Sequence, residues 1–474
     1  MTELAVATPL VALAGGALTA LARTPREADH ANVLAAIVTA LVALALAVAA
    51  IAGETASTRW LYVDAASGVF LAVIAVVGLC SALVSPIYLR TSGRSWFTAA
   101  RSRRAYYAAL YAFWAALLAI PISANLAVVW LVVEATTGAS ALLVSFSGRR
   151  EALEAGWKYL VLTTLGLSVA LLGIVILAIA QAGLGAHGLH ALGWDALTAA
   201  PLPEEETLLA FVLITAGLAT KIGWAPVHNW LPDAHSEAPA PISALLSAAL
   251  LPTVVLVAWR VKDALAPPAA DAVFIGFGLA SMLIAVPFLW RSLPFKRLLA
   301  YSSLEHMGVI ALGLGIGGRL AIAGVLLHVC GHALAKALGF YAALPLLRAD
   351  PDAASQPLAG VAAPTATAIG ISLVALSGLP PSPLFVSELL IALGGIEAGE
   401  TAVVAVAIVA LALGFLGLLH ALLTGLLDEP RRRSRRHRSY RPIIALTCTL
   451  GGGLLALTAA SALLPGSALV EGLL

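Results

Sequence analysis

The chain has 474 residues, of which 61% are hydrophobic and only 11% are charged, and its mean hydropathy is +0.98. Soluble domains carry about 25% charged residues, so this chain cannot cover an aqueous surface, and lipid must be the solvent for much of it. The formal net charge of +2 gives no indication of a nucleic-acid partner.

The hydropathy pattern predicts an all-α membrane protein, because a bilayer needs about 20 apolar residues for each spanning helix. We predict about 14 transmembrane helices in one polytopic membrane domain, residues 1–474, with short polar linkers. The predicted spans are about 4–22, 32–52, 63–88, 104–121, 123–146, 157–183, 208–230, 241–261, 270–290, 297–317, 319–346, 362–391, 401–427 and 442–464. The first segment lacks the positively charged start of a signal peptide, so we expect it to be a true span.

The distribution of positive charge predicts the orientation of these spans. When each loop is numbered by the span that it follows, the odd loops hold 21 Lys and Arg and the even loops hold 4. The last odd loop alone has seven arginines between residues 431 and 441. The odd loops are therefore predicted to be cytoplasmic and both termini to lie outside. The arginine-rich loop is read as a topology anchor to anionic lipid, with a docking site for a soluble partner as the alternative.

Two of the predicted spans contain helix-breaking residues. The seventh span has Gly223 and Pro226, and the twelfth has the segment 378–383, which contains one glycine and three prolines. Unwound backbone at membrane depth is tolerated only where it lines a cavity or is buried in protein. The breaks lie five spans apart, and paired broken helices indicate inverted repeats with an ion path between them. We expect spans 4–8 (about 104–261) and spans 9–13 (about 270–427) to form the two repeats.

Ionisable residues inside the spans are the strongest indication of function, because a bare charge at bilayer depth is costly and usually marks an ion or proton path. Glu134 lies in the middle of the fifth span, and Lys221 lies just before the seventh-span break. A low-dielectric site favours the neutral form of a lysine, whereas a nearby carboxylate favours its charged form. The pair could therefore switch between holding and releasing a proton. The alternative is a static ion pair that only locks two helices.

A second group of such residues lies in the later spans. His328, His332 and Lys336 are spaced by four residues, which places them on one face of a helix. Neutral histidine both donates and accepts hydrogen bonds, so stacked histidines with water can relay protons. His306 is a candidate for the same line, and Glu388, which follows the twelfth-span break, could be the terminal carboxylate. The alternatives are core histidines bonded to backbone carbonyls and a zinc site, for which no third ligand is obvious nearby.

The cysteines indicate that redox chemistry belongs elsewhere. Cys80, Cys330 and Cys448 stand alone in apolar runs, and no CxxC motif is present. Iron–sulfur clusters need several spaced thiolates, so we expect no metal and no cofactor in this chain and no catalytic redox centre of its own.

Three motifs then resemble a known family. The run from Lys221 to Ser243, which includes His228, strongly resembles the seventh-helix signature of antiporter-like subunits. These subunits occur in respiratory complex I, Mrp-type cation/proton antiporters and group 4 nickel–iron hydrogenases. Residues 296–308 and 328–336 fit the same family. Within it, the chain looks most like the hydrogenase-4 component F branch.

The resemblance implies roles for the matching residues. Glu134 and Lys221 look like the fifth-helix glutamate and its seventh-helix lysine partner, and Lys336, with the two histidines before it, looks like the central relay. Glu388 looks like the twelfth-helix exit residue. One departure is that many members carry a further lysine in the eighth helix, where residues 250–253 offer none. The link between the two half-paths would then rest on water and on Ser or Thr.

The expected function is a proton-translocating membrane subunit of a multisubunit redox-driven complex of the hydrogenase-4 or complex I type. Its expected partners are other membrane and soluble subunits of such a complex and the lipid bilayer, with no nucleic acid, and its expected location is a prokaryotic inner membrane. The alternatives are a subunit of an Mrp-type cation/proton antiporter and a non-conducting scaffold subunit.

Overall fold

The computed structural model describes the chain except for residues 92–99, 200–201, 345–362, 428–440 and 464–474. The described part is almost entirely helical, with one two-stranded antiparallel sheet of β1 (Ala56–Ser57) and β2 (Tyr62–Val63). The helices are α1 (Thr2–Leu21), α2 (Pro25–Ile51), α3 (Ala65–Thr91), α5 (Ala100–Ala119), α6 (Leu126–Val144), α7 (Arg150–Gly183), α8 (Trp194–Ala199), α9 (Glu204–Ile222), α10 (Leu231–Glu237), α11 (Ala240–Leu245), α12 (Leu251–Leu265), α13 (Ala270–Leu289), α14 (Phe295–Ile316), α15 (Gly318–Ala342), α17 (Ala363–Leu376), α18 (Pro383–Glu397), α19 (Thr401–Leu427) and α20 (Arg441–Leu463).

Each predicted span coincides with a helix or with two consecutive helices. Ten of the helices in the described part are long and apolar enough to cross a membrane. The other four predicted spans coincide with helices that are shorter, divided or more polar, so the number fourteen stays a prediction. Most of the arginine-rich loop before α20 lies outside the described residues.

Both predicted interruptions are present in the structure. α9 ends at Ile222 and is capped by Gly223, whose φ of 79° is left-handed and suits glycine, and the chain continues without a helix until α10 begins at Leu231. The second half of this broken helix is therefore α10, which lies beyond the predicted limit of residue 230. In the twelfth span, α17 ends at Leu376, and α18 begins after Ser382, whose hydroxyl caps the helix by accepting from the backbone N–H of Leu384 at 3.1 Å.

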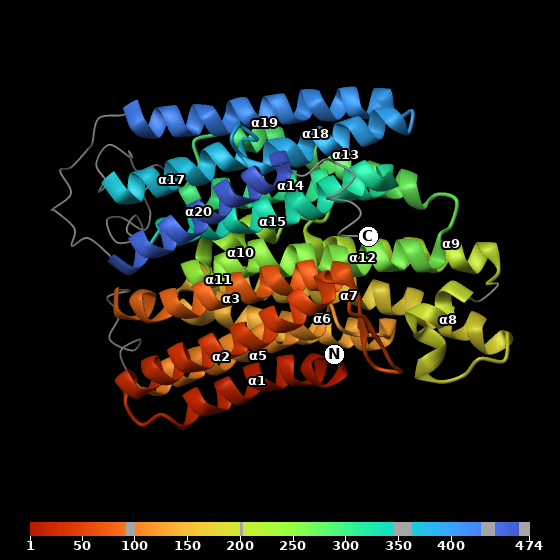
Figure 1. The fold of residues 1–474 in the computed structure, drawn as a ribbon, viewed down its shortest axis with the longest axis horizontal. Helices are drawn as coiled ribbons and strands as arrows, with labels where there is room; N and C mark the ends of the chain where they lie inside the picture. Colours follow the sequence, from red (N-terminus) through yellow and green to blue (C-terminus); the bar gives the residue numbers. More distant parts are fainter. Residues whose placement is uncertain (92–99, 200–201, 345–362, 428–440, 464–474) are drawn as a thin grey trace.

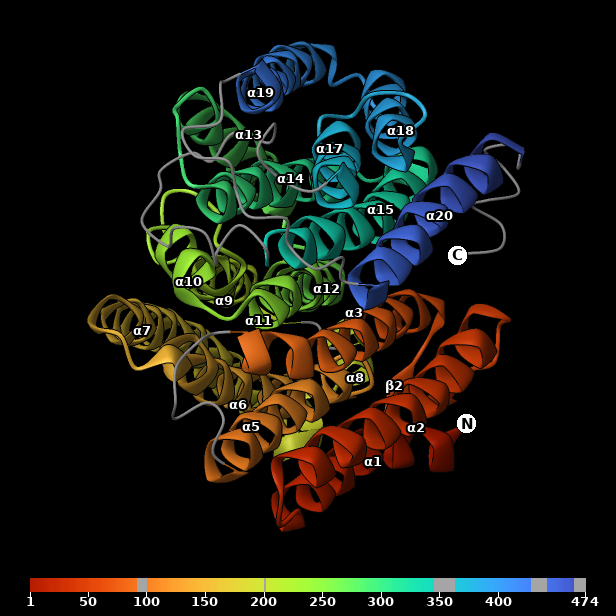
Figure 2. The ribbon, with the colours of Figure 1, turned by 90° about the vertical axis from the view of Figure 1, so that its left-hand side faces the viewer.

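The helices run side by side along the long axis of the molecule (Figure 1). In the end-on view, α13, α14, α15, α17, α18 and α19 gather in one group, and α1, α2 and α5 lie at the opposite side (Figure 2). α3 lies between the groups, where it packs against α11 and α15. The N-terminal helices therefore cover one flank of a core that is built by the later ones.

Burial separates core helices from helices that face the surroundings. α14 and the helix from Ala240 to Leu265 are almost wholly buried, whereas α1, α7 and α19 expose many large apolar side chains. Leu10, Leu165 and Val409 are more than half exposed. Large exposed apolar surfaces of this kind mark contact with lipid or with other protein, as expected for a multi-pass membrane protein.

Ion pairs at the helix ends connect loops of the same parity. Arg149 pairs with Glu237 at 2.5 Å, and Asp233 pairs with both Lys158 (3.5 Å) and Arg297 (3.0 Å). These residues lie in the fifth and seventh predicted loops or at the span ends that border the fifth and ninth, so these three loops meet at one end of the molecule.

Even-numbered loops meet in the same way. Arg260, at the end of the eighth predicted span, pairs at 3.1 Å with Asp64, at the start of the third span next to the second loop. The same guanidinium donates to the hydroxyl of Ser67 at 2.6 Å and, at 3.0 Å, to the carbonyl oxygen of Pro121, the last residue of the fourth span. The alternation on which the charge argument depends is therefore consistent with the contacts of these loops.

Candidate functional site

The first cluster of buried polar groups surrounds Lys221, in the last turn of α9. This side chain is fully buried. Its ammonium group donates to the hydroxyl of Thr137 at 2.7 Å and to that of Tyr159 at 2.5 Å, and it lies 4.7 Å from the centre of the Tyr159 ring. The Tyr159 hydroxyl is in turn hydrogen-bonded to that of Ser140 at 2.8 Å. Lys221 is thus held by hydroxyl groups from α6 and α7.

Glu134, on α6, lies beside this cluster but is not directly paired with the lysine. Its Oε1 accepts from the hydroxyl of Thr164 at 2.8 Å, whereas its Oε2 is buried and has no hydrogen-bond partner among the described residues. No ion pair within 4.0 Å joins Glu134 to Lys221 in the part of the chain that the structure describes. The two charges interact at longer range, so the contact expected from a locked ion pair is not formed here.

The seventh-span break continues this cluster. Trp230, at its end, packs against Tyr159 with ring centres 4.7 Å apart and donates to the carbonyl oxygen of Thr220 at 2.6 Å. That bond satisfies a carbonyl near the end of α9. His228 lies within the break and is 9% exposed, with no hydrogen-bond partner for its Nδ1 among the described residues. His228 precedes Trp230 by two residues in the break, and no hydrogen bond joins it to Lys221.

A second cluster is formed by histidines of α14 and α15. His306 Nδ1 and His328 Nε2 are hydrogen-bonded at 3.0 Å, and His328 Nδ1 bonds the hydroxyl of Ser387 on α18 at 2.9 Å. His332 is fully buried, 5.3 Å from His306 between ring centres, and neither of its nitrogens is hydrogen-bonded within the described residues. The alternative of histidines tied to backbone carbonyls therefore does not describe His328 or His332.

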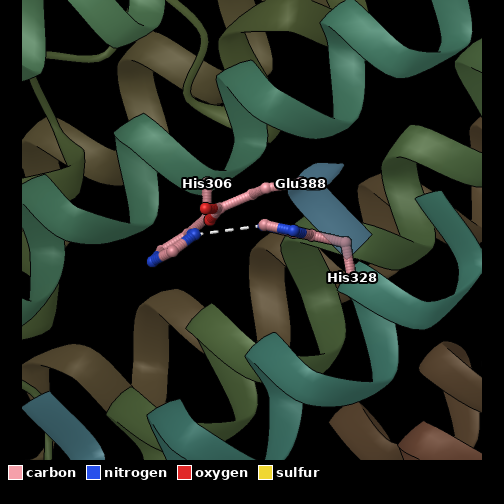
Figure 3. A group of neighbouring side chains, drawn as sticks. All are labelled: His306, His328 and Glu388. Atoms are coloured by element: carbon pink, nitrogen blue, oxygen red, sulfur yellow. Dashed lines mark hydrogen bonds between the residues drawn. The ribbon is translucent and has the colours of Figure 1, made fainter. Parts of the chain in front are cut away.

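Glu388 joins this cluster from α18 (Figure 3). Its carboxylate, His306 and His328 offer donor atoms that all lie within 4.8 Å of one another. No third ligand near the histidine pair was evident from the sequence, because His306 and Glu388 come close only in the folded chain. The two imidazoles nevertheless direct their facing nitrogens at each other, as in a hydrogen-bonded relay.

Glu388 also borders a cavity. The cavity has a volume of about 380 Å³ and is lined mostly by apolar side chains of α14, α18 and α19 together with the twelfth-span break. The Glu388 carboxylate lies against Gly378 in this break, and a Cβ atom at that glycine would be 2.5 Å from Oε2. Glu388 thus stands between the histidines and the cavity.

Lys336 lies on the same helix as the two α15 histidines. Its ammonium group is fully buried and donates to the backbone carbonyl of Leu299 on α14 at 2.6 Å. No ion pair within 4.0 Å joins Lys336 to an acidic side chain among the described residues, and the charge of Glu305, on α14, acts on it at longer range.

The eighth span contains a local irregularity where a lysine was missing from the sequence. A π-helical turn, Leu246–Leu250, separates α11 from α12, and such turns often occur at functional sites. Ser247, in this turn, is hydrogen-bonded to the hydroxyl of Ser303 on α14 at 2.7 Å. Serine hydroxyls therefore connect the eighth span to the helix of the second cluster.

Several buried polar groups were not singled out from the sequence. Tyr159 belongs to the first cluster, Glu305 lies near the second, and His235 is fully buried on α10 with its ring stacked against Phe340. Glu305 and His235 stand in motifs that the sequence displayed. Their burial could not be predicted from the sequence, because both occur next to polar residues and not in long apolar runs.

Fold and site together define a multi-pass membrane protein whose core encloses two clusters of ionisable side chains, each next to a broken helix. The family described as NADH:quinone oxidoreductase/Mrp antiporter, transmembrane, matches residues 123–414. The chain belongs to this family.

Individual relatives agree with this assignment. The chain is 34% identical over 398 residues to a hydrogenase-4 component F homolog from Methylacidiphilum infernorum, covering 81% of this chain and 82% of that protein. It is 31% identical over 395 residues to NADH-quinone oxidoreductase subunit N from Desulforudis audaxviator, covering 79% and 75%. Its fold superposes on a chain of the Mrp complex from Dietzia sp. with a TM-score of 0.84 at 20% identity, covering 100% and 97%. It is thus an antiporter-like membrane subunit.

Proposed function

We propose that this chain translocates protons across the membrane as a subunit of a multisubunit, redox-driven complex of the hydrogenase-4 or complex I type. The observation that carries the proposal is that Lys221 and Lys336 are fully buried, with no carboxylate within 4.0 Å among the described residues. A buried charge without a close partner is expensive, and in a membrane it usually marks a proton or ion path.

The proposed relay uses the predicted residues in order. Lys221 exchanges protons with the hydroxyl cluster around Tyr159, under the influence of Glu134. The Ser247–Ser303 bond and water connect the halves, because water stays where two to four polar groups hold it. Lys336 and the hydrogen-bonded histidines then pass protons toward Glu388. The relay residues are His228, His306, His328 and His332 together with the two lysines and the two glutamates.

The proposal includes topology and assembly. By the positive-inside rule, the odd loops, which hold most of the Lys and Arg, would lie in the cytoplasm and both termini outside a prokaryotic inner membrane. The two broken helices are the seventh and twelfth spans of inverted repeats, about 104–261 and 270–427. Other membrane and soluble subunits would supply the redox centres. The relatives named above as hydrogenase and NADH-quinone oxidoreductase components support this choice.

A cation/proton antiporter subunit of Mrp type is the second candidate. The family description and the fold of the Dietzia Mrp chain favour it. In that case transport would follow the ion gradient and would not need redox turnover. A non-conducting scaffold is the third candidate, and the missing eighth-span lysine supports it.

The test is Lys221→Ala in the complete complex. Without Lys221, the first cluster loses the side chain that holds and releases the proton, so the site no longer cycles. Alanine adds no charge to the buried site, so the helices should still pack. We expect the complex to assemble but proton movement per electron to fall at least tenfold, followed with a pH-sensitive dye in vesicles alongside redox turnover.

Lys158→Ala is the matched control. Lys158 is also a lysine of the first half, but it is 47% exposed and pairs with Glu154 at 2.7 Å on the surface of α7. This variant should pump as the wild type does. Normal proton movement per electron in Lys221→Ala would show that Lys221 is structural and would favour the scaffold. Transport driven by a sodium gradient without any electron donor would favour the antiporter.

A further inference from the structure

Glu305 is a buried acid that the proposed relay does not use. It lies on α14, directly before His306, and is only 3% exposed. Acidic side chains are almost never buried to this extent without a partner or a function. α14 is also among the most enclosed helices of the core, so Glu305 is placed by tertiary packing far from bulk water.

The position of its carboxylate depends on a glycine of α19. A Cβ atom at Gly414 would be 1.8 Å from Glu305 Oε1, so no larger residue fits there unless the carboxylate moves. The arrangement matches that of Glu388, whose carboxylate lies against Gly378. The carboxylates of Glu305 and Glu388 therefore each lie against a glycine of a neighbouring segment.

Glu305 lies on the helix that Lys336 contacts. The Lys336 ammonium group donates to the carbonyl oxygen of Leu299, on the same helix as Glu305, at 2.6 Å, and the charge of Glu305 acts on both Lys336 and Glu388. Its sequence neighbour His306 is bonded to His328, which in turn bonds Ser387, the residue before Glu388. Glu305 thus lies among the residues that join the lysine to the terminal carboxylate.

The predicted repeats give Glu305 a counterpart. Span 5 is the second span of the first predicted repeat, and span 10 is the second span of the second repeat. The helix α6 therefore corresponds to α14. Each of these helices carries one buried or half-buried glutamate, Glu134 on α6 and Glu305 on α14. Each glutamate also acts electrostatically on a fully buried lysine, Lys221 or Lys336.

We propose that Glu305 is a further proton-carrying residue, which takes the proton from Lys336 and delivers it toward Glu388. In the first step an N–H bond of the Lys336 ammonium breaks, an O–H bond forms on Glu305, and both groups become neutral. In the second step the Glu305 carboxyl gives this proton to the Glu388 carboxylate and becomes anionic again. This inference rests on the proposed function, and it makes Glu305, not Glu388, the partner of Lys336.

The test compares Glu305→Gln with Glu305→Asp in the complete complex in vesicles. The amide has nearly the same shape but cannot carry the proton, so proton movement per electron should fall at least tenfold while redox turnover continues. The aspartate keeps a carboxylate and should restore part of the transport. A structural role would give the opposite order, because the isosteric amide would then disturb packing less than the shorter acid.

A second variant tests whether the position of the Glu305 carboxylate matters, without changing any charge. Gly414→Ala forces the flexible end of Glu305 to move, and its transport should fall. Gly370→Ala on α17, where a Cβ atom would meet nothing within 4 Å, is the control and should transport normally. If the complex with Glu305→Gln does not assemble, transport by the Gly414→Ala complex becomes the test. Normal transport by that complex would overturn the proposal.

The outcomes also separate this inference from the function on which it rests. Wild-type proton movement per electron in Glu305→Gln, together with its loss in Lys221→Ala, would show that Glu305 is structural while the chain still conducts. Normal proton movement in both variants would overturn the proposed function itself.

Discussion

The twelfth-span break allows a test of how the backbone positions Glu388, a residue of the proposed relay. Gly378 has φ of 66°, and the Glu388 carboxylate lies against this glycine. In Gly378→Ala, the left-handed conformation costs about 1–2 kcal/mol for any residue with a Cβ atom. The new methyl group would also stand 2.5 Å from Oε2, where ordinary contact begins at 3.4 Å.

These numbers predict two separate effects. The backbone strain should lower the stability of the complex by about 1–2 kcal/mol. The carboxylate must also move by about 1 Å, and a misplacement of this size can cost on the order of 10²-fold in a reaction that depends on geometry. We therefore expect proton movement per electron to fall between about tenfold and a hundredfold.

Gly399 provides a matched control. Its φ of 82° is equally left-handed, but a Cβ atom there would meet nothing within 4 Å. Gly399→Ala should lose a similar amount of stability and keep its transport. Stability would be followed by thermal unfolding of the purified complex, and transport by a pH-sensitive dye in vesicles. Equal transport in the two variants would refute the claim that the position of Glu388 matters.

Two further predictions follow from the contacts. Because the facing nitrogens of His306 and His328 are hydrogen-bonded to each other at 3.0 Å, the purified complex should hold no more Zn²⁺ than its His328→Ala variant, measured by metal content after dialysis. One extra Zn²⁺ in the wild type would show that these residues and Glu388, whose donor atoms lie within 4.8 Å of one another, form a metal site. Asp64→Asn leaves the guanidinium of Arg260, which is 11% exposed, without its counter-charge. The stability of the complex should fall by about 1–3 kcal/mol in thermal unfolding, which is less than for a fully buried pair because both side chains are partly exposed. The number of protons moved per electron should not change.

Local chemistry made the main elements predictable from the sequence. Long apolar runs marked the helices, and glycine with proline marked both breaks, because these residues act on their own segment of backbone. The helix that follows the seventh-span break, α10, lies beyond the predicted end of that span for a related reason. α10 contains Asp233, His235 and Glu237, so its composition is that of a polar loop, and only its packing against α7 and α14 explains why it is a helix there.

The partners of the ionisable residues could not be predicted in the same way. Lys221 and Glu134 were expected to pair because each is unusual in its own span. The folded chain instead gives the lysine hydroxyl partners, Thr137 and Tyr159. Which of several neighbouring groups a long side chain reaches depends on distances between helices, which no single segment of sequence determines. Glu305 was overlooked as a site residue for the same reason.

The placement of charge in this core is difficult to explain by stability alone. Replacing buried charged groups by well-packed apolar residues is often neutral or stabilising, and hydroxyl or carbonyl partners compensate a buried ammonium less than a close carboxylate does. Yet Lys221 and Lys336 are fully buried and donate to hydroxyl or carbonyl groups, whereas Glu134 and Glu305 act on them only at longer range. A lysine in this position can change its charge at modest cost, whereas a lysine in a tight ion pair would resist deprotonation. The longer Glu–Lys separation is therefore the feature that a proton relay needs and a structural ion pair does not.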